Sequence, residues 1–362
     1  MSAVALPFPA LRHPIVQAPM AGGPSTPALT AAVCAAGGLG VVAAGYRTAD
    51  QVGEDVAAVR SLTDAPFAVN LFHADAATVD QASLTAYERE LAVEATRRGV
   101  ALGEPRHDDD SLEQKLELLL RVRPAAVSFT FGCPDAALVD RLHAHGIAAW
   151  ATVTERAEAR TAAGAGVDAL ILQGVEAGGH RGAFVDVDGR GEVGLLALLR
   201  LVAADSDLPL IASGGIADGA GVAAVLAGGA RAAQIGSAFM RTPEAGTSAP
   251  QRAALTEERQ TALTRAFSGR RARGIVNAFM RAHDRTAPSA YPQVHHLTGP
   301  LRAAARAQGD AEGFNLWAGQ AYRLAEERPA GDLVRRWSEE ARAALAAAQQ
   351  RLGSSGPVPG DP

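Results

Sequence analysis

Eight short apolar runs, separated by segments of helical length, constrain the fold of this 362-residue chain more than any other feature. The runs are almost continuously apolar rather than alternating, which is typical of parallel strands that helices cover. Asp135–His145 is one such intervening helix, and Pro134 precedes it at a favourable starting position. The predicted strands are Ile15–Met20, Leu39–Gly45, Phe67–Phe72, Ala125–Gly132, Ala148–Val153, Ala169–Gly174, Pro209–Gly215 and Ala232–Phe239.

Eight strand–helix units in series favour a closed barrel over a doubly wound open sheet. The open sheet would place a glycine-rich phosphate loop between its first strand and the following helix. A literal match to the dinucleotide fingerprint, Gly38–Ala43, follows a predicted helix and opens a strand, which is the reverse order. The sequence therefore predicts an α/β fold of the (β/α)₈ TIM-barrel class.

Two segments interrupt the strand–helix alternation. His73–Leu112 follows the third predicted strand, and Arg252–Arg351, expected to be helical, follows the eighth. Segments that follow barrel strands emerge on the face where barrel enzymes have their active sites. We therefore expect a barrel from residues 1–72 and 113–251, covered by a smaller, mostly helical lid from residues 73–112 and 252–351. Residues 352–362 are rich in glycine, proline and serine and are predicted to form a disordered tail.

Composition and charge exclude several classes of partner. A net charge of -5 without a polybasic run argues against nucleic-acid and membrane-surface binding. The uncharged stretch Ala28–Gly45 has the length of a membrane span, but its central glycines favour a helix followed by a buried strand. Two distant cysteines, Cys34 and Cys133, suit a reducing cytoplasm. We expect a cytoplasmic protein, monomeric or homodimeric, that binds small molecules.

The segment Glu176–Gly182, which reads Glu-Ala-Gly-Gly-His-Arg-Gly, follows the sixth predicted strand. Its glycines allow the backbone to approach a planar ligand closely. At the active-site face of a barrel, the imidazole of His180 could act as a general base or as a hydrogen-bond donor. The alternative is a flexible glycine-rich loop that contains a histidine without a chemical role, and the residues alone leave both interpretations open.

The ends of the seventh and eighth strands are candidates for a phosphate site. These are the usual phosphate-binding positions of a TIM barrel, where backbone N–H groups face the anion. Tight turns without a ligand are the alternative interpretation. The residues concerned are Ser213, Gly214 and Gly215 after the seventh strand, and Gln234, Ile235, Gly236 and Ser237 at the eighth.

Two carboxamides, Asn70 and Gln173, lie at or near the ends of the third and sixth strands. A buried amide needs hydrogen-bond partners, and either a heteroaromatic ligand edge or the neighbouring strands could supply them. Cys133 lacks an identifiable base and is expected to be a passive thiol. His295-His296 and His107–Asp110 lack the ligand spacing of a metal site, so no metal is predicted.

Taken together, these segments resemble the nitronate monooxygenases, formerly called 2-nitropropane dioxygenases. The resemblance extends from about Pro14 to Tyr322. The set of segments together is specific for this family, whereas no single segment is. The matching segments are Gln17–Gly23, Asn70, Gln173, Glu176–Gly182, Ser213–Ile216, Gln234–Phe239 with Thr242–Thr247, Tyr291-Pro292, His296–Arg302 and Leu316–Gln320.

The resemblance implies FMN as the cofactor and a nitronate, with propionate 3-nitronate the expected substrate, as the electron donor. Oxidation with O₂ would give nitrite and a carbonyl compound. His180 would be the catalytic residue, which polarises the nitronate or removes the α-proton of a neutral nitroalkane, and Tyr291 would line the substrate pocket. The implied FMN contacts are Pro19, Met20, Ala21, Asn70, Gln173, Gly178, Gly179, Ser213, Gly214, Gly215, Gln234, Ile235, Gly236 and Ser237.

Three alternatives remain at this stage. A flavin-dependent enoyl-acyl-carrier-protein reductase of the same superfamily also carries a Glu-Ala-Gly-Gly-His loop and takes hydride from NADH. An NADH:quinone reductase on the same scaffold is a second possibility. A catalytically silent FMN-binding protein is the third, although the intact glycine loops and His180 argue against it.

Overall fold

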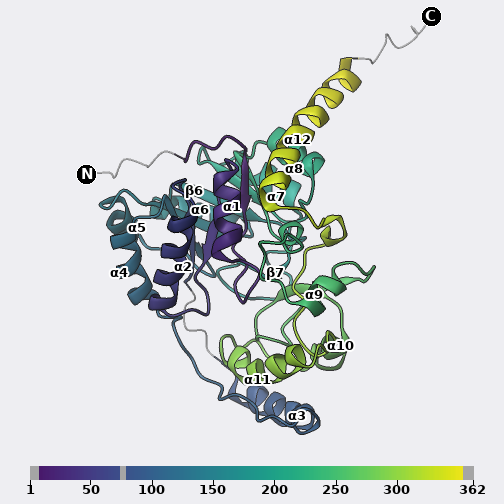
Figure 1. Cartoon of the computed structure of the whole chain (residues 1–362). Coiled ribbons are helices and arrows are strands. Elements are labelled where there is room, and N and C mark those ends of the chain that lie inside the picture. Colours follow the sequence, from purple (N-terminus) through teal and green to yellow (C-terminus); the bar gives the residue numbers. More distant parts are fainter. Residues whose placement is uncertain (1–7, 74–78, 354–362) are drawn as a thin grey trace, which may run out of the picture.

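Eight parallel strands form the central barrel of the computed structural model, which describes residues 8–73 and 79–353 (Figure 1). The strand order is β1-β9-β8-β6-β5-β4-β3-β2, and a parallel bridge between Val16 and Leu39 closes the ring. This arrangement confirms the predicted (β/α)₈ barrel. The strands are β1 (Ile15–Gln17), β2 (Val41–Ala43), β3 (Ala68–Phe72), β4 (Ala126–Thr130), β5 (Ala148–Val153), β6 (Ala169–Gln173), β8 (Leu210–Ser213) and β9 (Ala232–Ile235).

Helices cover the outside of the barrel, and local sequence signals explain where several begin. Thr48 and Gln51 form a reciprocal capping box, and the side chain of Asp135 accepts from the backbone N–H of Leu138. Gly166 ends another helix in the left-handed conformation. The helices are α1 (Pro27–Ala35), α2 (Ala49–Leu62), α4 (Leu112–Val122), α5 (Ala136–His143), α6 (Arg156–Ala165), α7 (Leu195–Ala203) and α8 (Gly219–Ala227). The short helix α9 (Ala249–Ala254) packs instead in an apolar cluster with Ile275 and Ala305.

Six of the eight predicted strands end one to four residues earlier than expected, including β8 and β9, which precede the predicted phosphate site. β8 stops at Ser213, because Gly214 and Gly215 have φ angles of 119° and 70°, which a strand does not contain. β9 stops at Ile235 and is followed by a 3₁₀ helix, η1 (Ser237–Phe239). Ala238 and Phe239 are buried, so their hydrophobicity made the turn look like a continuing strand. Both glycine segments therefore lie on the rim of the barrel rather than within its sheet.

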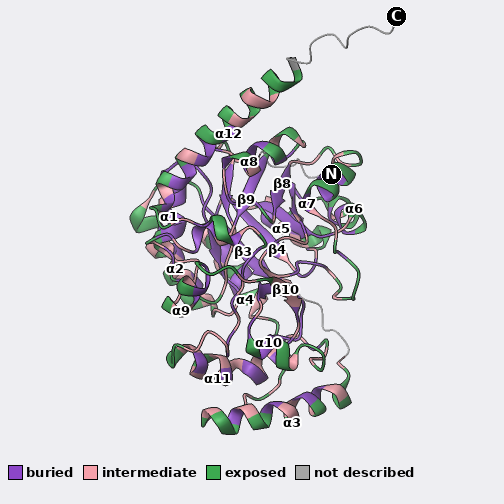
Figure 2. Ribbon diagram, turned by 90° about the vertical axis from the view of Figure 1, so that its right-hand side faces the viewer, coloured by how far each residue is buried: buried purple, intermediate pink, exposed green. Residues whose placement is uncertain are grey.

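A second unit, which we call the lid, covers the rim. It contains α3 (Gln81–Arg98), α10 (Ala278–His283), α11 (Gln293–Ala307) and a three-stranded antiparallel sheet. The sheet has the order β10 (Thr261–Thr264), β11 (Ala272–Ile275) and β7 (Gly179–His180). The lid has its own apolar core, which includes Tyr87, Phe267 and Leu297. In Figure 2, α11 lies between the barrel and α3, and α3 packs against α11.

The predicted C-terminal segment, residues 252–351, differs from the structure in two ways. It contains the strands β10 and β11, which lack an apolar pattern because β11 buries Arg273 beside its apolar residues. Its last helix, α12 (Ala330–Gly353), packs on α8 and α1 of the barrel and not on the lid. Trp337 anchors this helix against Phe239, with ring centroids 5.0 Å apart. The remaining element is the 3₁₀ helix η2 (Tyr322–Leu324).

The chain termini bear on two further predictions. Most of the tail predicted as disordered, residues 354–362, lies outside the described residues, and Leu352 and Gly353 belong to α12. Within residues 8–73 and 79–353, no helix has both the length and the apolar character needed to span a membrane. The exact boundary between barrel and lid stays a prediction.

Candidate active site

A cavity of about 450 Å³ lies between the carboxyl ends of the barrel strands and the lid. Its volume falls within the range of small-molecule and cofactor sites. The opposite end of the barrel is closed, because Trp150 stacks on Phe8 with their ring centroids 5.3 Å apart. Barrel loops supply one part of the cavity wall, and the lid supplies the other. The two parts differ in chemistry and are described in turn.

The glycine-rich ends of β8 and β9 line the cavity with unpaired backbone donors. In the described part of the chain, the N–H groups of Gly214, Gly215 and Gly236 make no backbone hydrogen bond. Ser237 also lines this end, and its Oγ accepts the N–H of Gly319 at 2.8 Å. Convergent unpaired N–H groups bind phosphate without requiring a cationic side chain.

An unpaired hydroxyl adds to this polar wall. The Oγ of Ser248 is enclosed by the protein, lines the cavity and has no hydrogen-bond partner among the described residues. A buried hydroxyl without a partner is costly, and a ligand atom in the cavity would satisfy it. Sequence reasoning did not select Ser248, because nothing distinguishes it from an ordinary residue before a helix.

The two predicted carboxamides have different environments. The Nδ2 of Asn70 donates to the Oγ of Ser128 and the Oγ1 of Thr130, each at 3.0 Å. Its Oδ1 has no partner within the described chain and is left for an N–H donor in the cavity. Gln173 also lines the cavity, but its side chain bridges the β7 loop: Nε2 donates to His180 O, and Oε1 accepts from Gly182 N. Gln173 therefore positions the histidine segment directly.

The other predicted cofactor contacts line the same cavity, with one exception. Ile235 is fully buried in the main apolar core, its carbonyl oxygen accepts the N–H of Ala18, and it does not line the cavity. Contact between these residues and a cofactor stays a prediction. The predicted contacts that the structure places in the cavity lining are Pro19, Met20, Ala21, Asn70, Gln173, Gly178, Gly179, Ser213, Gly214, Gly215, Gln234, Gly236 and Ser237.

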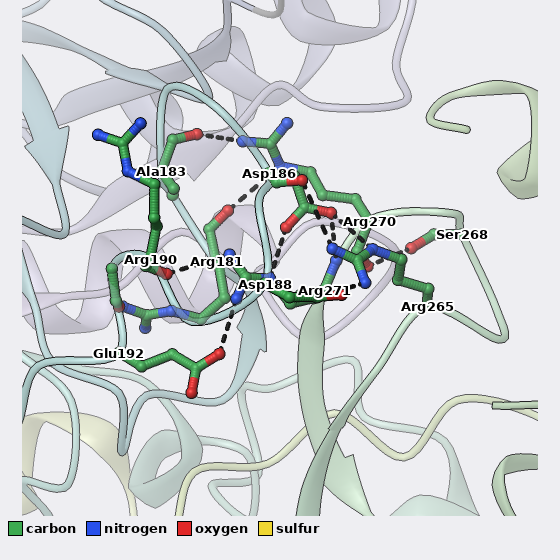
Figure 3. A network of polar contacts seen from close by, with 12 residues as sticks. Arg181, Ala183, Asp186, Asp188, Arg190, Glu192, Arg265, Ser268, Arg270 and Arg271 are labelled. Atoms are coloured by element: carbon green, nitrogen blue, oxygen red, sulfur yellow. Dashed lines mark hydrogen bonds and ion pairs between the residues drawn. The ribbon is translucent and has the colours of Figure 1, made fainter. Parts of the chain in front are cut away.

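His180 comes from the sixth barrel unit but pairs with the lid. As part of β7 it lies opposite Ala272 of β11, and the N–H of Arg181 donates to Arg271 O at 2.8 Å. A buried ionic network holds this junction (Figure 3). Arg271 forms ion pairs with Asp186 at 2.6 Å and with Glu192 at 2.7 Å.

The side chain of Arg181 also holds the β7 segment in place, through hydrogen bonds to the barrel side. Its guanidinium donates to the carbonyl oxygens of Gly174 and Gly191, both at 2.7 Å. Burial lowers the pKa of Arg181 to about 10, so this side chain remains protonated at neutral pH. The backbone that carries His180 is thus tied both to β6 and to the loop that follows β7.

The hydroxyl of Ser268 is the hydrogen-bond partner of one ring nitrogen of His180. The Oγ of Ser268 lies 2.8 Å from Nε2 of His180 and 3.2 Å from the carbonyl oxygen of Arg270. We assign the single hydroxyl hydrogen to the carbonyl oxygen, which can only accept, so that Oγ accepts from Nε2–H. In this assignment neutral His180 is protonated on Nε2. Its Nδ1, which has no partner among the described residues, is left with a free lone pair.

The surroundings of His180 also keep the ring neutral. Burial lowers its pKa to about 3, and the positive charges of Arg270 and Arg302 act in the same direction. The guanidinium of Arg270 lies over the ring of Phe131, 4.2 Å from its centroid, and Phe131 in turn contacts His180 edge-on. A neutral imidazole with a free Nδ1 can accept a proton, but it cannot donate one from that atom.

Aromatic side chains surround His180 on the lid side. Tyr291, predicted to line the substrate pocket, lies 5.8 Å from His180 between ring centroids, and its hydroxyl is 3.5 Å from that of Tyr46. Tyr291 lines an adjoining cavity of about 380 Å³ rather than the larger one. Tyr46, Phe72 and His295 line both cavities and separate them. A role for Tyr291 in substrate binding stays a prediction.

Two arginines of α11, Arg302 and Arg306, are the charged residues of the cavity wall. The lining contains no aspartate, glutamate or lysine in the described part of the molecule. Sequence reasoning quoted Arg302 within a family segment but assigned no role to either residue. Arg302 and Arg306 are four positions apart on one predicted helix, so the sequence indicates that they share a face of it. No other feature of the sequence points to these two residues.

The remaining reactive side chains show no catalytic arrangement. Cys133 is half-buried, and burial raises its pKa to about 11, so its thiol is protonated at neutral pH. Cys34 is buried, and its pKa is raised to about 11 for the same reason. His296 forms an ion-pair contact with Asp108 at 2.5 Å. Across residues 8–73 and 79–353, no cluster of three histidine, cysteine or acidic side chains is placed to hold a metal ion.

Comparison with known proteins gives this cavity a family context. The sequence pattern described as nitronate monooxygenase matches residues 9–340. The nitronate monooxygenase of Pseudomonas aeruginosa is 42% identical over 346 residues, which cover 92% of this chain and 97% of that protein. The nitronate monooxygenase of Paraburkholderia phytofirmans is 41% identical over 352 residues, which cover 94% and 95% respectively.

Solved structures agree with the sequence relatives. Nitroalkane oxidase from Streptomyces ansochromogenes has a TM-score of 0.91 at 48% identity, covering 93% of this chain and 98% of that one. FabK from Thermotoga maritima is more distant, with a TM-score of 0.74 at 25% identity, covering 94% and 96%. Because the family pattern spans most of its length and its relatives exceed 40% identity, the chain belongs to the nitronate monooxygenase family, whose members are flavin-dependent oxidoreductases.

Proposed function

We propose that this protein uses FMN and O₂ to oxidise alkyl nitronates, with propionate 3-nitronate as its substrate, to nitrite and a carbonyl compound. The observation that carries the proposal is the asymmetry of one cavity. Unpaired backbone donors line its barrel end, whereas His180 and Arg302 line the lid end, and no acidic side chain of the described residues belongs to the lining. Such a cavity suits an anionic cofactor and an anionic substrate together. We propose a cytoplasmic location and a monomeric or homodimeric state, as the sequence predicts.

The residues present fit FMN. The free N–H groups of Gly214, Gly215 and Gly236 and the unpaired Ser248 hydroxyl are suitable donors for a phosphate and a ribityl chain. The free Oδ1 of Asn70 is an acceptor for an N–H of the isoalloxazine edge. FMN, when bound, supplies the redox centre that takes electrons from the nitronate and passes them to O₂.

The chain's own contribution is placement, charge and control of one proton. Arg302 gives the lid end of the cavity a positive charge, which favours entry of an anionic substrate. His180, neutral and protonated on Nε2, offers Nδ1 as the acceptor for the α-proton of a neutral nitroalkane. The polarising role expected from the resemblance needs a donor at Nδ1, which this tautomer lacks. We therefore assign the proton-accepting role to His180.

The relatives support oxidation of this substrate class. The chain resembles proteins named nitronate monooxygenase over nine-tenths of its length, and it resembles a structure named nitroalkane oxidase at 48% identity. The similarity to FabK is weaker, so the NADH-dependent reductase is the alternative to be tested.

The test is anaerobic reduction of the flavin in purified protein reconstituted with FMN. We expect propionate 3-nitronate to bleach the flavin and NADH to leave it oxidised, with nitrite formed once air is admitted. Rapid bleaching by NADH without nitrite would move the assignment to a reductase. A protein that binds FMN but is reduced by neither compound would be a silent flavin-binding member.

A further inference from the structure

We propose that Arg302, reinforced by Arg306, forms a carboxylate subsite, so that the preferred nitronate carries a second anionic group. The inference rests on the proposed function, because it assigns the tail of the same substrate. It goes beyond that function by naming the residues that would select a carboxylated nitronate over a simple alkyl nitronate. The argument begins from the partners of Arg302.

Every hydrogen-bond partner of Arg302 is a neutral group. Its Nε donates to the Oγ1 of Thr298 at 3.0 Å, and its Nη2 donates to His295 O at 2.7 Å. Its Nη1 makes one long contact with the Oδ1 of Asn315 at 3.4 Å. No ion pair to Arg302 or Arg306 is formed by any acidic residue in the described chain. Nη1 therefore keeps a donor for a ligand in the cavity.

Arg302 is removed from water, so the lack of an acidic partner leaves its positive charge uncompensated. Removal from water lowers the pKa of Arg302 to about 10, and the positive charge of Arg306 acts in the same direction. Arg306 lies over the ring of Phe314, 4.7 Å from its centroid, and also lines the cavity. Two guanidinium groups one helical turn apart repel each other, and an anion between them would relieve the repulsion.

The surroundings of Arg302 place it away from the proposed phosphate end. Its backbone partner His295 stacks on Tyr46 at 4.2 Å, and Tyr46 contacts Phe72 at the end of β3. In the closed strand order, β3 lies across the barrel from β8, which carries the glycine end of the cavity. Asn315 lines the cavity beside Arg302 and offers its amide as a further donor. A carboxylate is the group that a guanidinium fork and an amide recognise together.

The experiment compares two nitronates on the FMN-loaded enzyme. Propionate 3-nitronate carries the carboxylate, and propyl 1-nitronate lacks it. Arg302→Met removes the charge and keeps much of the length, Arg302→Lys keeps the charge, and Arg306→Met tests the second arginine. The control is Arg281→Met, since Arg281 is an exposed lid arginine outside the cavity. Binding of succinate, an unreactive isostere of propionate 3-nitronate, is measured by the change in flavin absorbance.

For Arg302→Met we expect kcat/KM for propionate 3-nitronate to fall about 10- to 100-fold, the range for a lost charged hydrogen bond. The value for propyl 1-nitronate should change less than about threefold, succinate binding should be lost, and Arg302→Lys should recover part of both. Arg281→Met should match the unmodified protein in every measurement.

Three results would overturn the subsite. Equal loss for both nitronates would show a general role for Arg302, and unchanged succinate binding would show no carboxylate contact. Loss of FMN affinity in Arg302→Met would assign the arginine to the cofactor phosphate. Failure of the proposed function would give a different result, because the unmodified enzyme would then be inactive on both nitronates. Succinate binding tests the subsite independently, since it requires no turnover.

Discussion

The two ends of the cavity are built by different means. At the barrel end, backbone groups of Gly214, Gly215 and Gly236 supply the donors, and no charged side chain takes part. At the lid end, the side chains of His180 and Arg302 supply the chemistry, held by partners from other elements. The barrel end is therefore a property of local chain conformation. The lid end exists only when separate elements are packed together.

This difference implies that the two ends can be disrupted independently. Backbone donors are lost when a turn changes its conformation, which weakens cofactor binding. Side-chain chemistry is lost when one group or its orienting partner is removed, which leaves the cofactor in place. The predictions below test that independence, beginning with the largest expected effect.

His180→Gln should separate the lid end from the barrel end most clearly. Without Nδ1 as acceptor, oxidation of neutral nitroethane should fall about 10²- to 10⁴-fold, the usual contribution of a general base. Oxidation of ethyl nitronate, which has already lost its proton, should fall less than about tenfold by the same reasoning. Steady-state oxygen consumption with each substrate, together with FMN affinity, provides the measurement. Equal losses on both substrates would contradict the proton-accepting role.

Gly215→Ala should damage the barrel end alone. The φ of 70° at Gly215 costs a residue with a side chain about 1–2 kcal/mol. The added Cβ would also lie 3.1 Å from the Cβ of Glu176. We expect FMN affinity to weaken about tenfold, which corresponds to ~1.4 kcal/mol, when measured by fluorescence titration.

Gly99→Ala is the matched control for this change. Gly99 has a φ of 66°, ends α3 in the lid, and has no atom within 4 Å of an added Cβ. It should lower stability by a similar amount without changing FMN affinity. If both variants lose FMN equally, the loss reports general destabilisation rather than a damaged phosphate cradle.

Ser268→Ala removes the acceptor that fixes the tautomer of His180. The Nε2–H would lose its partner, and oxidation of neutral nitroethane should fall about five- to tenfold, in keeping with one hydrogen bond. Ser268→Thr, which keeps the hydroxyl, should restore most of the rate. The ¹⁵N shifts of His180 should change from a fixed Nε2–H tautomer to a mixture in the alanine variant.

Ser338→Ala is the control, because Ser338 is a buried serine of α12 outside the cavity. A lowered rate without a change in the ¹⁵N shifts of the Ser268→Ala protein would contradict tautomer control. An unchanged rate would show that His180 does not depend on this contact.

The pH dependence of stability gives the smallest expected effect. The pKa of His180 is lowered from 6.5 to about 3, so between these values the unfolded chain binds a proton that the folded protein does not. The free energy of unfolding should therefore fall as pH drops below 6.5 and should be insensitive to this group above it. Urea denaturation at pH 7 and pH 4.5 should show a smaller decrease for His180→Gln. An identical decrease in both proteins would show that His180 titrates normally.

The sequence predicts the barrel end better than the lid end. The eight barrel strands are mostly apolar and almost entirely buried, and their order along the chain determines which loops meet at the rim. The errors there concern strand ends, since buried Phe239 in a 3₁₀ turn is as hydrophobic as a strand residue.

At the lid end, the relevant contacts join residues far apart in the chain. Ser268 meets His180 across 88 positions because β7 pairs with β11, and no local pattern encodes that pairing. Arg302 differs from the surface arginines because it lines the cavity, is removed from water and has no acidic partner among the described residues, and only the fold reveals these properties. His180 was found because its loop is distinctive, but its tautomer and charge state depend on neighbours supplied by the lid.

The position of His180 in the lid sheet has a consequence for evolution by recombination. The strand β7 lies between barrel strands β6 and β8 in the chain, yet it forms the edge of the β10–β11 sheet. A single crossover that exchanged the C-terminal half with a relative would replace β11 and Ser268 while leaving the old β7 in place. The imidazole and its orienting hydroxyl would then come from different parents. Viable hybrids should therefore inherit residues 179–192 and 261–275 from the same ancestor, as one discontinuous heritable block.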